Sequence, residues 1–345
     1  MNIPLEDLDY IKNYESIEWE KLRDKKIFIT GASGFFGIWI VNTLVYVNSS
    51  LKLNLELILL SRDVKKLRKK LSPIKDKFIS MIEGDINDIN IIFPDCNFII
   101  HAAASSDSIN YSLHRKEMLD TLISGSLNLF DFYSKKQKKI KILNISSGGF
   151  YGDLSYNPKP IEEDDNVSNL NIYNESGLYS VGKIVSELYA NIFSSSEHIE
   201  IINARCFAFV GPYLPLDKHF AIGNFINDVL QNKKISLSGN GSPIRSYLYM
   251  SDLVVALIIL LIKGKSGESY NVGSDQPISI LNLAKLINKI SSNNNDVSIN
   301  EVNNMSSSAN YYLPNINKIK FLGFDKFCSL ELSVKKTLNF YNKLN

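Results

Sequence analysis

The sequence of 345 residues predicts an α/β fold, with a doubly wound parallel sheet followed by a smaller C-terminal lobe. Three observations lead to this prediction. A glycine-rich turn at 30–37 joins an apolar run to a helical apolar pattern. Short apolar runs then alternate with helical patterns as far as residue 203, which is typical of a parallel sheet. Beyond Gly211-Pro212 this regular alternation ends.

The glycine-rich turn reads Thr-Gly-Ala-Ser-Gly-Phe-Phe-Gly and is typical of a site for a dinucleotide diphosphate. Gly31 allows a sharp turn off the strand, Gly34 allows the backbone to approach a phosphate, and Gly37 allows close packing of the helix on the sheet. The helix N-terminus then presents N–H groups and the positive end of its dipole. No Gly-Lys-Ser/Thr follows, so a P-loop is excluded. A turn that binds nothing is the alternative, and the flanking strand and helix favour a nucleotide site.

The other elements of the first half follow in order. The expected strands are 26–29, 55–60, a run ending near 82, 98–100, 140–145 and 200–203. The expected helices are 36–44, 64–71, 115–135 and 177–195. In such sheets a ligand binds beyond the carboxyl ends of the strands, and the glycine, serine and histidine motifs of this half lie at those ends.

The second half predicts a lobe that closes over the nucleotide fold. Its expected helices are 222–230, 251–263, 280–290 and 331–343, with a strand at 234–238. We expect an N-terminal extension at 1–25, a dinucleotide-binding domain at 26–206 to which 246–273 contributes, and a mainly substrate-binding lobe at 207–345. Two polar segments complete the chain, a loop over the site at 152–175 and a stretch at 293–310.

Composition excludes several classes of protein. The formal net charge is +2, so no nucleic-acid partner is expected, and the basic residues at 66–70 are interpreted as a solvated helix face. The longest apolar run, 253–262, is too short to span a bilayer and predicts a buried helix. The three cysteines are far apart and match no metal spacing or disulfide framework. The first residues lack a secretory pattern, so a cytoplasmic location without membrane contact is expected.

A tyrosine and a lysine four residues apart form the candidate catalytic pair. Tyr179 and Lys183 lie in a helical pattern, so their side chains are expected to share one helix face. A free tyrosine has a pKa near ~10, and a neighbouring lysine cation favours its phenolate. Ser147 lies near the predicted end of the fifth strand, where its hydroxyl is suited to bind a substrate oxygen. A solvated surface pair and a turn-capping serine are the alternative interpretations.

With these motifs in this order, the chain resembles the extended short-chain dehydrogenases/reductases of the NAD-dependent epimerase/dehydratase group, which act on nucleotide sugars. The resemblance extends over about 26–341 and implies a Rossmann-type sheet, a nicotinamide cofactor and a nucleotide-sugar substrate. The matching segments are Thr30–Gly37, Gly84-Asp85, His101–Ala104, Ser147 with Tyr151-Gly152, Tyr179 with Lys183, Arg205 through Gly211-Pro212, Arg245-Ser246-Tyr247 through Asp252, and Tyr270-Asn271-Val272-Gly273.

The resemblance also implies roles for single residues. Tyr179 would be the general acid/base on a sugar hydroxyl or ketone, Lys183 would lower its pKa and hold the nicotinamide ribose, and Ser147 would bind the same sugar oxygen. Asp85 would hydrogen-bond the adenine. The implied substrate-binding residues are Ser147, Gly148, Asn224 and Arg245, whose guanidinium suits phosphate oxygens. The implied cofactor-binding residues are Gly31, Ser33, Gly34, Phe35, Phe36, Gly37, Ser61, Arg62, Asp85, Ile86, Ala102, Ala103, Ala104, Tyr179 and Lys183.

Two departures from the family pattern concern the catalytic chemistry. Many nucleotide-sugar 4,6-dehydratases carry an acid directly after the catalytic serine or threonine, whereas this chain has Gly148 and Gly149. Leu122 stands where the family often has an asparagine. The expected activity is therefore hydride transfer at C4 of a nucleotide-linked hexose, as a 4-epimerase or a 4-ketoreductase. A 4,6-dehydratase with an acid from Glu162 or Glu163 is one alternative, and a non-catalytic cofactor-binding module is the other.

A third departure concerns the choice of cofactor. The second strand ends in Ser61-Arg62, without the acidic residue that binds the adenosine ribose and repels a 2′-phosphate. Arg62 favours NADP, with NAD possible, because Asp63 is placed to reach the ribose instead. A homodimer is also expected from the resemblance, through pairing of the helices 115–135 and 177–195. The apolar stripe that supports it is Met118, Leu122, Leu127 and Leu129.

Overall fold

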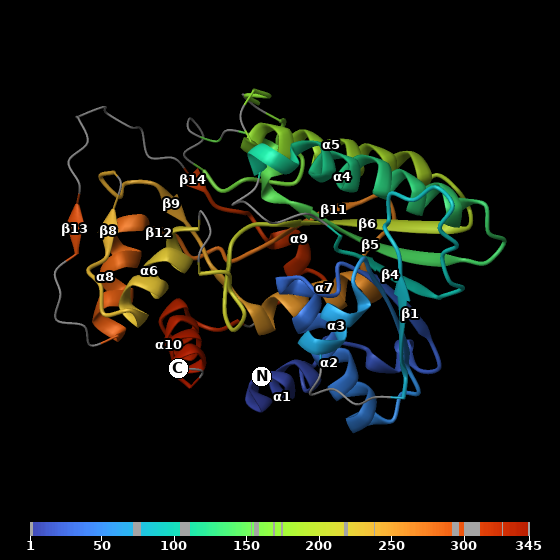
Figure 1. The fold of residues 1–345 in the computed structure, drawn as a ribbon, viewed down its shortest axis with the longest axis horizontal. Helices are drawn as coiled ribbons and strands as arrows, with labels where there is room; N and C mark the ends of the chain where they lie inside the picture. Colours follow the sequence, from blue (N-terminus) through green and yellow to red (C-terminus); the bar gives the residue numbers. More distant parts are fainter. Residues whose placement is uncertain are drawn as a thin grey trace.

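The structure of the chain, a computed structural model, describes residues 3–71, 77–103, 111–152, 154, 159–167, 170–173, 175–216, 220–237, 239–291, 297–299, 311–325 and 327–343. A seven-stranded sheet with the order β11-β6-β5-β4-β1-β2-β3 lies at its centre, and all neighbouring strands in it are parallel (Figure 1). The strands are β1 (Lys26–Thr30), β2 (Glu56–Ser61), β3 (Ile79–Glu83), β4 (Phe98–His101), β5 (Ile140–Ser147), β6 (Ile199–Cys206) and β11 (Ser269–Val272). The predicted doubly wound parallel sheet is confirmed.

The strand order reverses between β1 and β4. From β1 the chain proceeds through β2 to β3, and from β4 it proceeds in the other direction through β5 and β6 to β11. Thr30 at the end of β1 pairs with His101 at the end of β4, so the two strands stop at the same level. In doubly wound sheets the ligand crevice opens at this point.

Helices cover both faces of the sheet. The helices α4 (Tyr111–Ser134) and α5 (Glu175–Phe193) lie on one face, and α2 (Phe35–Leu51), α3 (Val64–Lys70) and α7 (Met250–Lys263) lie on the other (Figure 1). Successive side chains of β1 point to opposite faces, so Phe28 packs in the core beneath α4 while Ile27 and Ile29 pack in the core with α2 and α7. Residues 250–262 of α7 are buried on all sides, which explains their almost continuous apolar sequence.

The apolar stripe of α4 lies mainly inside the subunit. Met118, Leu122 and Leu129 are buried, and the Leu122 side chain packs where a Cβ on Gly182 of α5 would lie. Among the described side chains of this helix pair, the large apolar ones that are exposed are Leu188 and Ile192 of α5, at 54% and 66%. The homodimer stays a prediction, and Leu188 and Ile192 of α5 are exposed apolar residues that could contribute to it.

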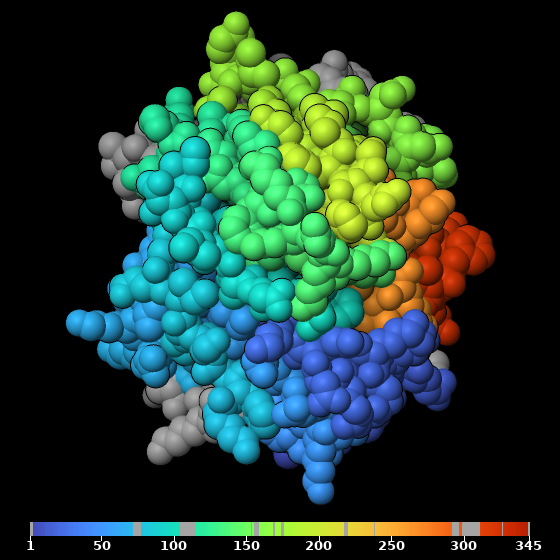
Figure 2. All heavy atoms as spheres, turned by 90° about the vertical axis from the view of Figure 1, so that its right-hand side faces the viewer, coloured from blue at the N-terminus to red at the C-terminus, as the bar shows by residue number. Residues whose placement is uncertain are grey.

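Residues 3–25 were expected only as an N-terminal extension, and they contain a helix that contacts distant parts of the chain. Helix α1 (Leu5–Lys12) packs on α7, and η1 (Trp19–Leu22) follows. The buried carboxylate of Asp7 accepts hydrogen bonds from Tyr249 at 2.8 Å and from Lys336 at 2.6 Å. On the face drawn in Figure 2, N-terminal residues (blue) border residues of the C-terminal part (orange and red). Lys263 Nζ lies 3.5 Å from a carboxylate oxygen of Glu18.

The C-terminal half forms helices and short strands beside the carboxyl ends of the sheet (Figure 1). The helices are α6 (Ala221–Leu230), α8 (Ile280–Ile290), α9 (Asn317–Lys320) and α10 (Leu330–Asn342). The short strands are β7 (Phe209–Val210), β8 (Ser236–Leu237), β9 (Ile244–Arg245), β10 (Leu248–Tyr249), β12 (Ile278–Ser279), β13 (Ser298–Ile299) and β14 (Tyr311–Tyr312). One buried apolar cluster contains residues of both halves, and the division into domains stays a prediction. None of the helices in the described ranges has the length and apolarity that crossing a membrane requires.

Candidate active site

The glycine turn between β1 and α2 has the geometry that a diphosphate site needs. Gly31 has a φ of +72°, and a Cβ there would lie 2.3 Å from the carbonyl oxygen of Ala102. A Cβ on Gly37 would lie 2.3 Å from the carbonyl oxygen of Gly31, so both positions require glycine. Helix α2 begins after Gly34, and no side chain caps its first turn. The turn therefore directs an uncapped helix N-terminus at the crevice, which fits a phosphate group.

The end of β2 shows which side chains are available to an adenosine ribose. Asp63, which the sequence left free to reach a ribose, caps α3 by accepting a hydrogen bond from the Lys66 backbone N–H at 2.8 Å. Arg62 is exposed beside it. Lys70 donates to the carbonyl oxygen of Ser33 in the glycine turn at 2.8 Å. The sequence showed Lys70 only as part of a basic helix face, because its contact with the turn depends on the packing of α3.

The predicted adenine-binding and nicotinamide-binding segments lie beside this turn. Asp85 follows β3, and its carboxylate accepts a hydrogen bond from the backbone N–H of Asn87 at 2.9 Å. Ile86 is buried against α4. The backbone N–H of Ala103 donates to Thr30 Oγ1 at 3.1 Å, which holds this segment against β1. Ala104 lies outside the described residues.

His101 supports the crevice from below and is not exposed to it. Its Nδ1 lies 2.9 Å from Thr30 Oγ1, and its Nε2 lies 3.1 Å from Ser126 Oγ on α4. Burial, and secondarily the charge of Lys183, lowers the pKa of His101 to about 3. A neutral imidazole therefore joins β1, β4 and α4 through hydrogen bonds.

Ser147, Tyr179 and Lys183 meet where the end of β5 faces α5. A Cβ built on Gly149 would lie 3.4 Å from Ser147 Oγ and 3.7 Å from Tyr179 Cδ1, so these two side chains flank one point. Lys183 Nζ lies 5.8 Å from the centroid of the Tyr179 ring and donates to the carbonyl oxygen of Ile145 at 2.6 Å. Burial lowers the pKa of Lys183 to about 8, against smaller effects of Cys206 and Glu187 that raise it. The lysine is thus a buried ammonium beside the tyrosine.

Tyr312 of β14 also reaches this point, and no local sequence signal indicated it. A Cβ on Gly148 would lie 2.5 Å from the Tyr312 hydroxyl oxygen, so this phenol fills the space of a side chain at 148. A side-chain hydrogen bond joins Tyr312 to Ser147. Burial raises the pKa of Tyr312 well above its usual value, so the phenol is neutral. The C-terminal half therefore contributes a hydroxyl group to the candidate site.

Arg245 lies next to Tyr312, because β9 and β14 pair in parallel at these two residues. The guanidinium of Arg245 lies 5.7 Å from the centroid of the Tyr312 ring, and its Nη1 donates to the carbonyl oxygen of Ile244 at 2.8 Å. The predicted phosphate-binding arginine is thus adjacent to Tyr312, which reaches the candidate catalytic groups. Asn224 is exposed on α6 and has a backbone hydrogen bond to Phe220.

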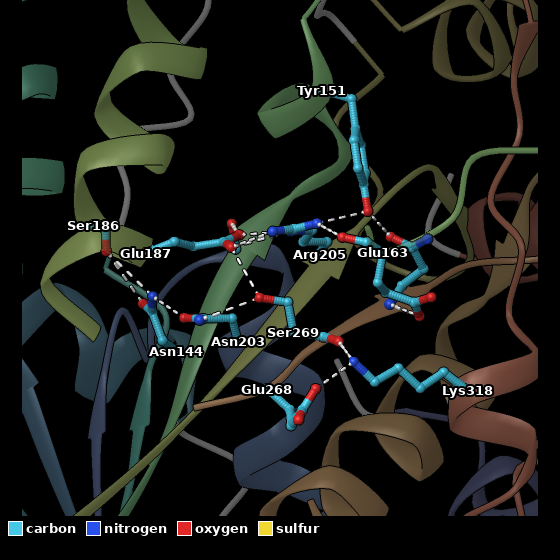
Figure 3. Close-up of polar contacts among 12 residues, drawn as sticks. Asn144, Tyr151, Glu163, Ser186, Glu187, Asn203, Arg205, Glu268, Ser269 and Lys318 are labelled. Carbon is cyan, nitrogen blue, oxygen red and sulfur yellow. Dashed lines mark hydrogen bonds and ion pairs between the residues drawn. The ribbon is translucent and has the colours of Figure 1, made fainter. Parts of the chain in front are cut away.

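A buried polar cluster lies behind the candidate catalytic groups, and Figure 3 shows most of it. Arg205 of β6 donates to the carboxylate of Glu187 through Nε at 3.1 Å and Nη2 at 2.8 Å, and its Nη1 donates to the Tyr151 hydroxyl at 2.8 Å. The backbone N–H of Asn271 donates to the Glu163 carboxylate at 2.8 Å, which binds the loop at 159–167 to β11. A cavity of about 430 Å³ opens beside this cluster, lined by Glu162, Glu163, Asp164, Arg205, Glu268, Ser269 and Lys318.

Known proteins with similar sequences act on nucleotide sugars, as their names state. The chain is 24% identical over 337 residues to UDP-glucuronic acid decarboxylase 1 of Xenopus tropicalis. The aligned region covers 97% of this chain and 76% of that protein. It is 30% identical over 284 residues to dTDP-D-glucose 4,6-dehydratase of Dictyostelium discoideum. This aligned region covers 77% of this chain and 62% of that protein.

Solved structures show the same fold. A UDP-glucose 4-epimerase of Thermotoga maritima with UDP-glucose has a TM-score of 0.77 at 21% identity, over 92% of this chain and 99% of that one. A dTDP-glucose 4,6-dehydratase of Bacillus anthracis in complex with NAD has a TM-score of 0.76 at 23% identity, over 92% and 97%. The model of the NAD dependent epimerase/dehydratase family matches residues 27–273, from the first strand to the end of β11. The chain therefore belongs to this family of nucleotide-sugar enzymes.

Proposed function

We propose that this protein transfers a hydride at C4 of a nucleotide-linked hexose, as a 4-epimerase or a 4-ketoreductase. The observation that carries the proposal is the meeting of Ser147, Tyr179 and Lys183 at the carboxyl end of β5, beside the crevice that begins at the glycine turn. A bound nicotinamide supplies the hydride acceptor or donor. The residues of the chain then have to bind the sugar, orient its C4 oxygen and move one proton.

In this proposal Tyr179 moves the proton. Its phenolate takes the proton from the C4 hydroxyl during oxidation, and the phenol formed returns the proton to the C4 oxygen during reduction. Lys183, whose pKa is about 8, is mostly protonated at neutral pH, and its charge favours the Tyr179 phenolate. Ser147 donates a hydrogen bond to the same sugar oxygen. Arg245 binds the phosphates of the nucleotide sugar, where a planar guanidinium suits two phosphate oxygens.

The surroundings of Ser147 argue against the alternative of a 4,6-dehydratase. The Tyr312 hydroxyl occupies the space that a side chain at position 148 would need, so an aspartate or glutamate there would clash with it. Glu163, one of the two acids considered as a substitute, is bound to the backbone of Asn271. Glu162, the other, is exposed and lines the cavity beside Arg205. Elimination of water needs an acid next to the serine and tyrosine, and these positions do not supply it.

We also propose that NADP(H) is preferred to NAD(H), although the dehydratase of Bacillus anthracis was solved with NAD. Asp63 is occupied as a helix cap, so Arg62 and Ser61 are left at the end of β2. A charge-assisted hydrogen bond from an arginine to a 2′-phosphate contributes about 1.5–3 kcal/mol, or roughly ten- to a hundredfold in affinity. Dissociation constants for both cofactors, in the wild type and in Arg62→Ala, test this. Equal constants in the wild type would contradict the preference.

The reaction is tested with purified protein and a panel of UDP- and dTDP-linked hexoses and 4-keto sugars, with product analysis by mass spectrometry and NMR. The expected product is a C4 epimer or a C4 alcohol, and Tyr179→Phe is expected to lose most turnover while it binds cofactor normally. A tightly retained cofactor indicates an epimerase, and an exchanging one indicates a reductase. A 6-deoxy-4-keto product, loss of CO₂ from UDP-glucuronic acid, or full activity of Tyr179→Phe would overturn the proposal.

A further inference from the structure

One face of α5 is matched residue by residue to the end of β5. Tyr179, Lys183 and Glu187 are spaced four residues apart, so they lie on the same helix face. Tyr179 faces Ser147 across the Gly149 position, and Lys183 Nζ donates to the carbonyl oxygen of Ile145 at 2.6 Å. The third residue of this face, Glu187, accepts a hydrogen bond from the hydroxyl of Ser146, which lies between Ile145 and Ser147 in β5.

Glu187 is held from three strands at once. Its side chain is buried, and its carboxylate accepts hydrogen bonds from Ser146 of β5, from Arg205 of β6 at 2.8 Å and from Ser269 of β11 at 3.0 Å. Figure 3 shows the last two contacts, with Glu187 directed from α5 towards Arg205 and Ser269. A buried carboxylate with this number of donors is held in one position, because any movement that breaks a hydrogen bond leaves buried charge without a partner, which costs free energy.

We infer that Glu187 is a positioning residue of the active site, whose carboxylate fixes the α5 face carrying Tyr179 and Lys183 to the end of β5 carrying Ser147. The inference rests on the proposed function, because it assumes that these three residues perform the proton transfer. Of the three hydrogen-bonded strands, β5 alone carries a catalytic group, so the contact with Ser146 is the one that sets the catalytic geometry.

The charge of Glu187 acts on the same helix face. The groups that face Lys183 are the Tyr179 ring and Glu187 on α5, the Cys206 thiol on β6 and the His101 imidazole on β4. His101 is neutral, and burial raises the pKa of Cys206 to about 12, so it is a neutral thiol at physiological pH. Glu187 is thus the anion among them, and it raises the pKa of Lys183 against the effect of burial.

Two serine variants separate positioning from stability. Ser146→Ala and Ser269→Ala each remove one hydroxyl donor from Glu187 and keep its ion pair with Arg205. We expect Ser146→Ala to lower kcat about tenfold with little change in KM or cofactor affinity, since the α5 face then loses its hydrogen bond to the strand that carries Ser147. Ser269→Ala is expected to keep its kcat. Equal effects of the two variants on kcat, or no effect of Ser146→Ala, would overturn the inference.

The pH profile of Glu187→Gln gives a second readout. In the wild type, activity is expected to decline above about pH 8, where Lys183 loses its proton. Without the anion the pKa of Lys183 falls, so the decline moves to lower pH. If Glu187→Gln alone does not fold, Glu187→Gln with Arg205→Met removes the pair together. An unshifted decline contradicts the inference, whereas activity in Tyr179→Phe contradicts the proposed function itself.

Discussion

The contact between Gly148 and Tyr312 predicts the effect of adding a single methyl group. The φ of Gly148 is not positive, so alanine is compatible with the backbone, and the cost of Gly148→Ala is steric. The new Cβ would lie 2.5 Å from the Tyr312 hydroxyl oxygen and 2.9 Å from Phe207 Cδ1. Such overpacking in a filled site costs about 1–3 kcal/mol of unfolding free energy.

The size of the chain converts this cost into a melting temperature. For 345 residues the entropy of unfolding is about 0.7 kcal/mol/K, so Gly148→Ala is expected to lower Tm by roughly 1.4–4 °C. The same substitution moves the Tyr312 hydroxyl away from Ser147, so kcat is expected to fall while cofactor affinity is unchanged. Differential scanning calorimetry and steady-state kinetics measure the two effects.

A double-mutant cycle with Tyr312→Ala tests the stated cause. Truncation of Tyr312 removes the hydroxyl that the new methyl group meets, so Gly148→Ala is expected to cost less in the Tyr312→Ala background, by about 1 kcal/mol or more. Tyr312→Phe is the finer control, because it removes the oxygen and keeps the ring, whose Cζ is still 2.9 Å from the built Cβ. Additive free energies in the Tyr312→Ala cycle would refute the reasoning.

Three further predictions concern the cofactor turn, the lysine and the dimer. Gly31→Val is expected to abolish binding of NAD and NADP in calorimetry, because its Cβ meets the carbonyl of Ala102 at 2.3 Å; retained binding would show that the turn has no cofactor role. Lys183→Ala is expected to lose both turnover and cofactor affinity, and unchanged affinity would count against its contact with the ribose. Leu188→Glu is expected to convert a dimer into a monomer in sedimentation at micromolar concentration, since Leu188 and Ile192 are exposed on α5; a monomeric wild type would contradict the dimer.

The sequence predicted most of the sheet because its signals are local. The apolar runs and the glycine turn placed β1, β2, β4 and β5 with boundaries close to the observed ones, and β5 extends two residues further, to Ser147. Segment 270–273 matched a motif, yet the position of β11 as an edge strand depends on its pairing with β6, which local periodicity does not encode. Helix α1 was not predicted, because an aspartate such as Asp7 is typical of a surface position. Its burial depends on the hydrogen bonds from Lys336 and Tyr249, which are distant in the sequence.

The candidate site was partly predictable for a related reason. The spacing of four residues between Tyr179 and Lys183 indicates this pair in the sequence, and the position of Ser147 at a strand end indicates the serine. Tyr312 carries no such mark, because its contact with Gly148 is created only when β14 pairs with β9 at Arg245. Glu187 continues the spacing of the candidate catalytic pair, but its hydrogen-bond donors Ser146 and Ser269 lie on two strands, β5 and β11, whose contact with α5 is created only by folding.

The contacts of Asp7 also bear on the order in which the chain folds during synthesis. Helix α1 is made early, but the cation that binds its buried carboxylate is Lys336 of α10, and the second donor is Tyr249. Until α10 has left the ribosome, Lys336 cannot reach the carboxylate of Asp7. The native contacts of the Asp7 carboxylate can therefore be completed only after nearly the whole chain has emerged, even though domains generally fold from the N-terminus onwards.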